Sequence, residues 1–116
     1  HGDMKRDFTY IDDVVEGVLR VMDRPAASPV AGSAPYRVFN IGNSEPVQLL
    51  DFIGCIERAL GRTAAKRLLP MQPGDVPATY ACTQALQDWV NFAPSTPLEV
   101  GVRNFVNWYR EYYAPA

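Results

Sequence analysis

Two short polar segments carry the side chains best suited to chemistry in this 116-residue sequence. Near the N-terminal end, Lys5 and Arg6 precede a β-prone run. A guanidinium there could clamp a pyrophosphate through two parallel hydrogen bonds, because its planar fork matches the spacing of phosphate oxygens. A solvent-exposed basic pair without a ligand explains the same residues, so both interpretations stay open.

The second segment is the irregular loop 71–77, which contains Pro73, Gly74 and Pro77. The prolines stiffen this loop, and Gly74 lets the backbone turn or approach a ligand closely. Asp75 could accept hydrogen bonds from the paired hydroxyls of a sugar. A rigid connector with an aspartate-stabilised turn is the alternative.

Other reactive groups lack the neighbours that catalysis or metal binding requires. His1 is the only histidine and stands at the end of the chain, and Cys55 and Cys82 form no Cys-x-x-Cys pair. No glycine-rich dinucleotide or P-loop motif occurs. We therefore expect no catalytic residue and no metal site in this chain, and we expect both cysteines to be small buried side chains of a reduced, cytoplasmic protein.

Composition limits the partners. The net charge of −2 comes from 11 basic and 13 acidic residues without a basic run, so we expect neither nucleic acid nor a membrane surface as a partner. Apolar stretches are too short to span a bilayer, while an apolar content of 47% is enough for one core. The sequence opens without Met on a polar, turn-like stretch, and we expect it to begin in the middle of a protein.

The periodicity predicts elements in the order β-α-β-α-β-loop-α-α, which suits part of an α/β protein. The expected strands are 7–11, 36–41 and 64–69. The expected apolar stripes of three helices are Val14, Val15, Val18, Leu19 and Met22; Leu49, Leu50, Ile53, Ile56 and Leu60; and Leu98, Val102, Phe105, Tyr109 and Tyr112.

Local signals predict where these helices begin and end. Asp13 with Glu16, and Thr96 with Glu99, have the spacing of capping boxes for the first and last helices. The first helix should stop before Pro25. The second helix should start at Pro46–Val47 and end with Gly61 in the left-handed conformation, and Asn91 should end a short helix that carries Ala85, Leu86 and Trp89 in the same way.

Four stretches, in the same order along the chain, resemble the extended short-chain dehydrogenase/reductase family, and among its branches the UDP-glucuronate 4-epimerases. They are residues 1–13 (HGDMKRDFTYIDD), 36–43 (YRVFNIGN), 69–77 (LPMQPGDVP), and 94–98 (PSTPL) with the aromatic helix 108–113 (WYREYY). The resemblance covers almost the whole chain. It implies that residues 1–116 form a single substrate-binding, C-terminal portion of an NAD-dependent nucleotide-sugar epimerase, with the Rossmann half absent.

The resemblance also implies roles for three residues. The arginine that matches Arg6 contacts the diphosphate of a UDP-sugar, and the aspartate that matches Asp75 contacts the ribose hydroxyls. Gln72 stands where galactose-type epimerases usually have a second phosphate-binding arginine, which favours the glucuronate branch and leaves that contact open.

In the family, NAD and the catalytic Tyr-x-x-x-Lys pair belong to the half that this sequence does not contain. The residues four positions before Lys5 and Lys66 are His1 and Arg62, so the pair does not occur here. We therefore expect an isomerase as parent protein, a homo-oligomer with a UDP-sugar and its own Rossmann half as partners, and an isolated chain that binds no NAD and is inert. A same-family dehydratase or decarboxylase, and a non-catalytic binding or assembly domain, are the alternatives.

Overall fold

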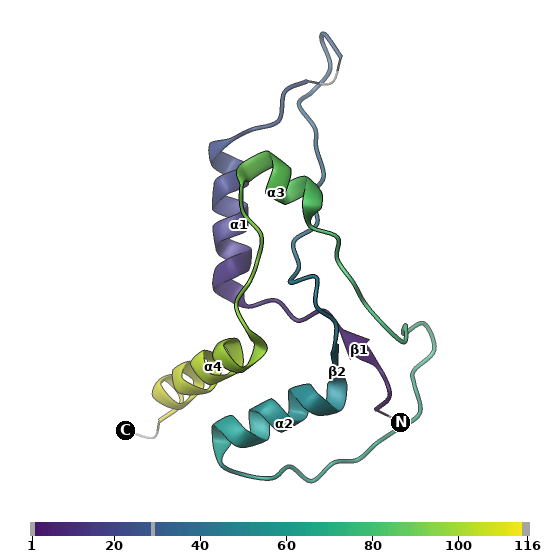
Figure 1. Cartoon of the computed structure of the whole chain (residues 1–116), viewed down its shortest axis with the longest axis vertical. Helices are drawn as coiled ribbons and strands as arrows, with labels where there is room; N and C mark the ends of the chain where they lie inside the picture. The colour runs from purple at the N-terminus through teal and green to yellow at the C-terminus, as the bar shows by residue number, and fades with distance from the viewer. Residues whose placement is uncertain (1, 29, 115–116) are drawn as a thin grey trace.

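The computed structural model describes residues 2–28 and 30–114, so His1 lies outside the described residues. The elements follow the order β1 (Lys5–Arg6), α1 (Ile11–Asp23), β2 (Val47–Gln48), α2 (Leu49–Leu60), α3 (Gln84–Val90) and α4 (Leu98–Tyr112). Helix α1 packs with α3 and α2 packs with α4, and the small sheet adjoins the start of α2 (Figure 1). The architecture mixes strands and helices as predicted, but the detailed order differs.

The strand predictions are wrong in place and extent. Strand β1 pairs antiparallel with β2, with Lys5 opposite Gln48 and Arg6 opposite Val47. Segments 36–41 and 64–69 have no regular secondary structure and, within the described residues, form no ladder. A strand needs a neighbour for its backbone N–H and C=O groups, and β propensity alone does not supply one.

Segment 64–69 is tied to the end of α2 instead. The Ala64 N–H (2.8 Å) and the Lys66 ammonium (2.5 Å) both donate to Oε1 of Glu57. The hydrogen bond from Lys66, followed by that from Ala64, lowers the pKa of the Glu57 carboxyl. Side-chain bonds therefore hold this segment where a sheet was predicted.

The helix ends set by backbone conformation are confirmed. Helix α1 ends at Asp23, before Pro25. Gly61 (φ 67°) and Asn91 (φ 51°) take the left-handed conformation after α2 and α3. These endings depend on the residue itself, which is why the sequence predicts them well.

The capping boxes are wrong. Tyr10 is the N-cap of α1 and Pro97 is the N-cap of α4, and neither helix has a side-chain cap. Asp13 lies inside the first turn of α1, where its Oδ2 accepts the backbone N–H groups of Ser95 (3.1 Å) and Thr96 (2.9 Å). The carboxylate predicted to start one helix thus holds the turn that leads into another.

The core is small and divided between the two helix pairs. Cys55 of α2 with Val102 and Val106 of α4 forms one buried cluster, surrounded by Phe52, Ile56, Ala59, Leu60 and Leu98. In the other pair, Leu86 of α3 is fully buried, and Gly17 of α1 lies against Ile41 and Phe92. Leu86, Ile56, Leu60, Leu98 and Val102 therefore confirm part of the predicted inner face.

Much of the predicted inner face is exposed. On α4, Phe105, Tyr109 and Tyr112 are 56%, 49% and 68% exposed, because α2 covers only the seam that contains Val102 and Val106. The apolar face of α1 is also open, with exposures of 44–69% at Ile11, Val15, Val18, Leu19 and Met22. Helical periodicity identified these faces correctly but not what covers them.

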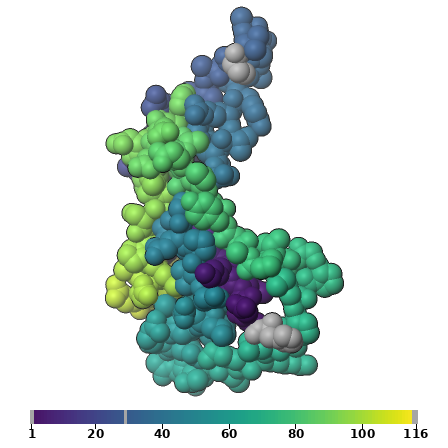
Figure 2. Space-filling view, turned by 45° about the vertical axis from the view of Figure 1, so that its right-hand side comes forward, coloured from purple at the N-terminus to yellow at the C-terminus, as the bar shows by residue number. Residues whose placement is uncertain are grey.

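The chain is open and elongated. Its radius of gyration is 18.0 Å, against about 13 Å for a compact domain of this length. Its accessible surface is 8509 Å², against about 6,300 Å² for a typical monomer of this mass. Segment 30–40 projects from one end (Figure 2). In the described part, no helix has the length and hydropathy needed to cross a bilayer.

We expect the isolated chain to self-associate through the exposed apolar faces of α1 and α4, since contiguous apolar side chains exposed to water favour association. Light scattering should show species larger than a monomer, and a hydrophobic dye should bind. Leu19→Gln should reduce both signals, whereas Asp12→Asn, at an exposed polar position of the same helix, should not. A monomer that binds no dye contradicts this expectation.

Candidate functional site

Strand β1 is held on both edges, which fixes the backbone around Arg6. One edge pairs with β2, and on the other edge Lys5 forms a parallel bridge with Ala78. The Lys5 N–H donates to the Pro77 carbonyl (2.8 Å), and the Thr79 N–H donates to the Lys5 carbonyl (3.2 Å). The end of loop 71–77 therefore lies beside β1.

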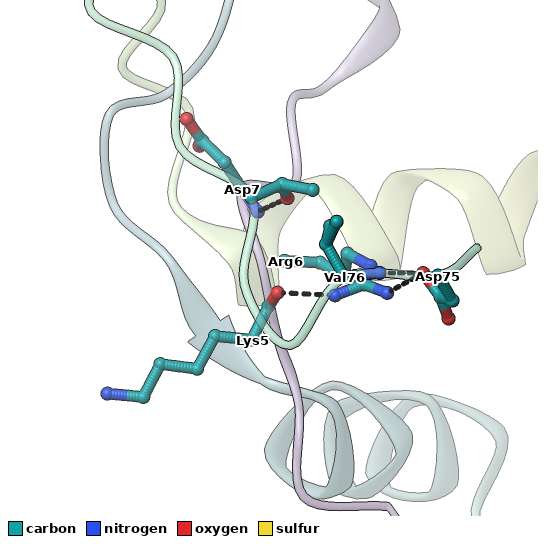
Figure 3. A network of polar contacts seen from close by, with 6 residues as sticks. Lys5, Arg6, Asp7, Asp75 and Val76 are labelled. Atoms are coloured by element: carbon teal, nitrogen blue, oxygen red, sulfur yellow. Dashed lines mark hydrogen bonds and ion pairs between the residues drawn. The ribbon is translucent and has the colours of Figure 1, made fainter. Parts of the chain in front are cut away.

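This pairing brings together two residues that the sequence analysis identified separately. Arg6 NH2 donates to Asp75 Oδ1 at 2.6 Å, and Arg6 NH1 donates to the Lys5 carbonyl at 2.9 Å (Figure 3). The two side chains are 20% and 41% exposed. An ion pair this exposed adds only about 0–1 kcal/mol to stability, so its main consequence is a fixed arrangement of a guanidinium beside a carboxylate.

Gln72 lies in the same turn as Asp75. The Asp75 N–H donates to the Gln72 carbonyl (3.1 Å), and Gly74 between them has a φ of 88°. Both side-chain contacts of Asp75, from Arg6 and from the Val76 N–H (2.9 Å), fall on Oδ1. The surface thus presents the Arg6 guanidinium, the Asp75 carboxylate and the Gln72 amide close together. This set of groups suits a ligand that carries an anionic group next to hydroxyl groups.

Sequence reasoning missed Asp7, which it assigned to a strand. Its carboxylate accepts four backbone N–H groups, from Asn43, Ser44, Glu45 and Ala81. These donors lie 36 to 74 positions away in the sequence. No local spacing in the sequence could indicate these partners, so the sequence alone does not reveal the role of Asp7.

Two hollows lie elsewhere, near the facing ends of α2 and α4, and neither includes Arg6 or Asp75. One is apolar, about 250 Å³, with Phe8 stacked on Phe52 in its wall (ring centroids 4.0 Å apart). The other, about 430 Å³, is lined by charged groups including Arg58 and Glu99. Among residues 2–28 and 30–114, no three His, Cys, Asp or Glu side chains gather in a way that could hold a metal ion.

Cys55, in the wall of the second hollow, is a structural thiol. Arg58 NH2 donates to its sulfur (2.9 Å), and the sulfur donates to Glu99 Oε1 (3.8 Å). Desolvation by burial raises the pKa of the Cys55 thiol and outweighs the opposing effect of Arg58. Because the thiolate is the reactive form, this environment disfavours a nucleophilic role for Cys55. Cys82, predicted to be buried, is exposed.

Comparison with known proteins indicates the family of the chain. Residues 1–42 match the sequence profile of the NAD dependent epimerase/dehydratase family. Together with the relatives described next, this match shows that the chain belongs to that family.

The relatives are similar to the chain over nearly all of its length. It is 48% identical, over 97% of its residues, to protein CapI of Staphylococcus aureus, and 42% identical, over 99%, to a probable UDP-glucuronate 4-epimerase of Rhizobium meliloti. It spans 37% of the length of each of these relatives.

A solved structure has the same fold over this stretch. The UDP-glucuronic acid 4-epimerase from Bacillus cereus, in complex with UDP-glucuronic acid and NAD, matches with a TM-score of 0.78 and 28% identity. The match covers 97% of this chain and 34% of that one. The exposed apolar faces of α1 and α4 therefore occur in a chain that spans about a third of the length of these relatives.

The different environments of the two cysteines give a test of this structure. In the native chain, an alkylating reagent should modify Cys82 quickly, and Cys55 only at the rate at which the α2–α4 pair opens. Variants Cys55→Ser and Cys82→Ser assign the two rates by mass spectrometry, and in urea both thiols should react alike. Equal rates in the native chain contradict the burial of Cys55.

Proposed function

We propose that this chain is the nucleotide-sugar-binding, C-terminal portion of an NAD-dependent epimerase that acts on a UDP-uronic acid. The main support for this proposal is the Arg6–Asp75 pair. Arg6 NH2 lies 2.6 Å from Asp75 Oδ1, and both side chains are partly exposed. Support comes from the similarity to a probable UDP-glucuronate 4-epimerase and to an epimerase solved with UDP-glucuronic acid.

In this proposal Arg6 binds the diphosphate and Asp75 binds the ribose hydroxyls. A guanidinium can give two parallel N–H donors to phosphate oxygens, and the contact to the Lys5 carbonyl orients the plane of that fork. Asp75 neutralises Arg6 before a ligand arrives, so the diphosphate replaces one anionic partner with another. The exposed Gln72 amide lies in the same turn and supplies a neutral contact where a second arginine would add charge.

The residues of this chain do not fit a dinucleotide. A dinucleotide pyrophosphate usually binds at a helix N-terminus behind a glycine-rich turn. Here the first turns of the three longer helices carry acidic residues: Asp12 and Asp13 in α1, Asp51 in α2 and Glu99 in α4. Their negative charges would repel a pyrophosphate, so we assign NAD to another part of the parent protein.

The partners and location of the parent protein stay predictions. We expect a cytoplasmic homo-oligomer in which a Rossmann half covers the apolar face of α1. In that assembly, NAD supplies the hydride chemistry from its own half, and the residues described here bind and orient the nucleotide part of the substrate.

The 116-residue chain alone should show no turnover of UDP-glucuronate in the presence of NAD. The reason is that the sequence contains neither a Tyr-x-x-x-Lys pair nor a glycine-rich dinucleotide loop. A chromatographic assay for UDP-galacturonate measures this. Turnover that persists after contaminating epimerase is removed would overturn the assignment of catalysis to the parent protein.

Substitutions at the Arg6–Asp75 pair of the parent protein test the binding site directly. Arg6→Ala should weaken UDP binding roughly ten- to hundredfold, because it removes a charge-assisted contact worth about 1.5–3 kcal/mol. Arg6→Lys should restore part of the affinity, since an ammonium cannot make the planar two-bond contact. Asp75→Asn should cause a smaller loss, which vanishes when inorganic pyrophosphate replaces UDP.

Calorimetry of UDP and NAD binding to the folded variants measures these effects. Lys5→Ala is the matched control, because the Lys5 side chain points away from the Arg6–Asp75 pair (Figure 3). Neither Lys5→Ala nor the Arg6 variants should change NAD affinity. If Arg6→Ala leaves UDP affinity unchanged, Lys5 and Arg6 are a solvated basic pair and the proposed site is wrong.

A further inference from the structure

We propose that Asp7 is a positioning residue that sets the register between Arg6 and Asp75, and so controls how the two side chains meet a nucleotide diphosphate. This inference rests on the function proposed above. The Asp7 side chain contacts neither the Arg6 side chain nor Asp75, and its carboxylate instead accepts backbone N–H groups from distant segments.

The Asp7 carboxylate joins two distant segments to the end of β1. Oδ1 accepts the N–H groups of Asn43 (3.1 Å) and Glu45 (3.4 Å), and Oδ2 accepts those of Ser44 (3.1 Å) and Ala81 (3.0 Å). Segment 43–45 leads into β2 on one side of β1. Segment 79–81 continues the backbone that lies on the other side. One carboxylate therefore connects both neighbours of the strand that carries Arg6.

The link to Asp75 runs along the backbone that follows it. The Pro77 carbonyl and the Thr79 N–H bond to Lys5. Further along, the Asp7 N–H donates to Thr79 Oγ1 (3.1 Å), and the Ala81 N–H donates to Asp7 Oδ2. Contacts at every second residue from 77 to 81 thus fix the register, and Asp7 takes part in the last two, through its backbone N–H at Thr79 and through its carboxylate at Ala81.

Register matters because a slip by one residue turns every side chain of an extended segment to the opposite side. Asp75 lies only two residues before the first of these contacts, so its position opposite Arg6 depends on them. The Asp7 carboxylate points away from the Arg6–Asp75 pair (Figure 3). It acts through the backbone and does not compete for the ligand.

The packing around Asp7 leaves little freedom. A Cβ at Gly42 would lie 2.4 Å from Ala81 Cβ and 3.0 Å from Asp7 Oδ2, so only glycine fits there. Ser44, in the left-handed region with a φ of 57°, donates from its hydroxyl to the Ala81 carbonyl (2.7 Å). The two segments gathered by Asp7 are therefore also in direct contact with each other.

The chemistry requires a carboxylate at this position. An ionised carboxylate only accepts, so both of its oxygens can face N–H donors. In Asp7→Asn, a side-chain NH₂ would replace one oxygen and face N–H groups with no acceptor. The variant keeps the shape of Asp7 but loses the contacts of one oxygen.

Asp13 provides a matched control from the same chain. Its Oδ2 also accepts two remote backbone N–H groups, from Ser95 and Thr96, but it holds the turn before α4 and not the backbone beside Arg6. Asp7→Asn and Asp13→Asn are therefore the same chemical change at two carboxylates that both gather backbone amides. Asp7→Asn should lower the melting temperature more than Asp13→Asn, because one amide oxygen can replace Asp13 Oδ2 but cannot replace both oxygens of Asp7, and only Asp7→Asn should change ligand binding.

The experiment measures UDP and NAD affinity of the folded parent protein by calorimetry, well below each melting temperature. Asp7→Asn should weaken UDP binding by at least about threefold, the lower range of coupling within one hydrogen-bond network, and leave NAD affinity unchanged. Asp13→Asn should leave both unchanged. In a background that carries both Arg6→Ala and Asp75→Ala, Asp7→Asn should have no further effect on UDP affinity, because it acts through the placement of these two side chains.

If folded Asp7→Asn binds UDP as tightly as the unsubstituted protein, or if it weakens UDP binding further when Arg6→Ala and Asp75→Ala are both present, the inference is wrong. Should Asp7→Asn fail to fold, Thr79→Val can be used, because it removes the hydroxyl that accepts the Asp7 N–H. Thr79→Ser is the control that keeps this hydroxyl. Thr79→Val should weaken UDP binding about twofold, as expected for one neutral hydrogen bond, and Thr79→Ser should not. Unchanged affinity in Thr79→Val overturns the inference in that case.

The result with Arg6→Ala alone separates the two proposals. If Arg6→Ala has no effect on UDP affinity, the proposed function fails. If Arg6→Ala weakens binding while Asp7→Asn and Thr79→Val do not, only the positioning role fails.

Discussion

The two-residue strand β1 must satisfy backbone groups on both of its edges, and the rest of the structure depends on this requirement. On one edge it pairs with β2, and the Leu49 N–H, at the start of α2, donates to the Met4 carbonyl (2.9 Å). On the other edge it bonds to the backbone at Pro77 and Thr79. The start of α2, the candidate site and the end of the long connection between α2 and α3 all meet at or beside this strand, although it contributes no residue to the apolar core.

Two aspartates extend this arrangement by the same physical means. A carboxylate can accept several N–H groups at once, and Asp7 and Asp13 use this capacity to hold turns that the short strands and small core leave loose. The fold buries few apolar side chains, so these polar contacts help to keep its turns defined while large faces of α1 and α4 stay exposed.

Local features of the structure could be predicted from the sequence, and features that need a distant partner could not. Gly61 and Asn91 end helices because of their own backbone preferences, and the periodicity placed Leu86 on an inner face correctly. The strand predictions at 36–41 and 64–69 failed because strand formation depends on what lies alongside. The aromatic face of α4 was recognised as apolar but wrongly assigned to the core, since the sequence does not state what covers it, whereas the apolar face of α1 was recognised and is exposed.

The candidate site shows the same division. Arg6 and Asp75 were identified from their chemistry and from a family resemblance, yet their ion pair depends on backbone pairing across 69 positions. Asp7 had no local signal, because its partners lie in segments that only the fold brings together. Sequence reasoning thus identified groups that can touch a ligand but missed the group that holds their backbone in place.

The 69-position separation of Arg6 and Asp75 also governs when the site can form. Helices form within about a microsecond, because their contacts are local. Joining distant segments has the additional entropic cost of closing a long loop. During synthesis the N-terminal side of the site leaves the ribosome first and lacks its counterpart until the chain has passed Ala81. The candidate site is therefore a late product of folding, assembled only after most of this chain has emerged.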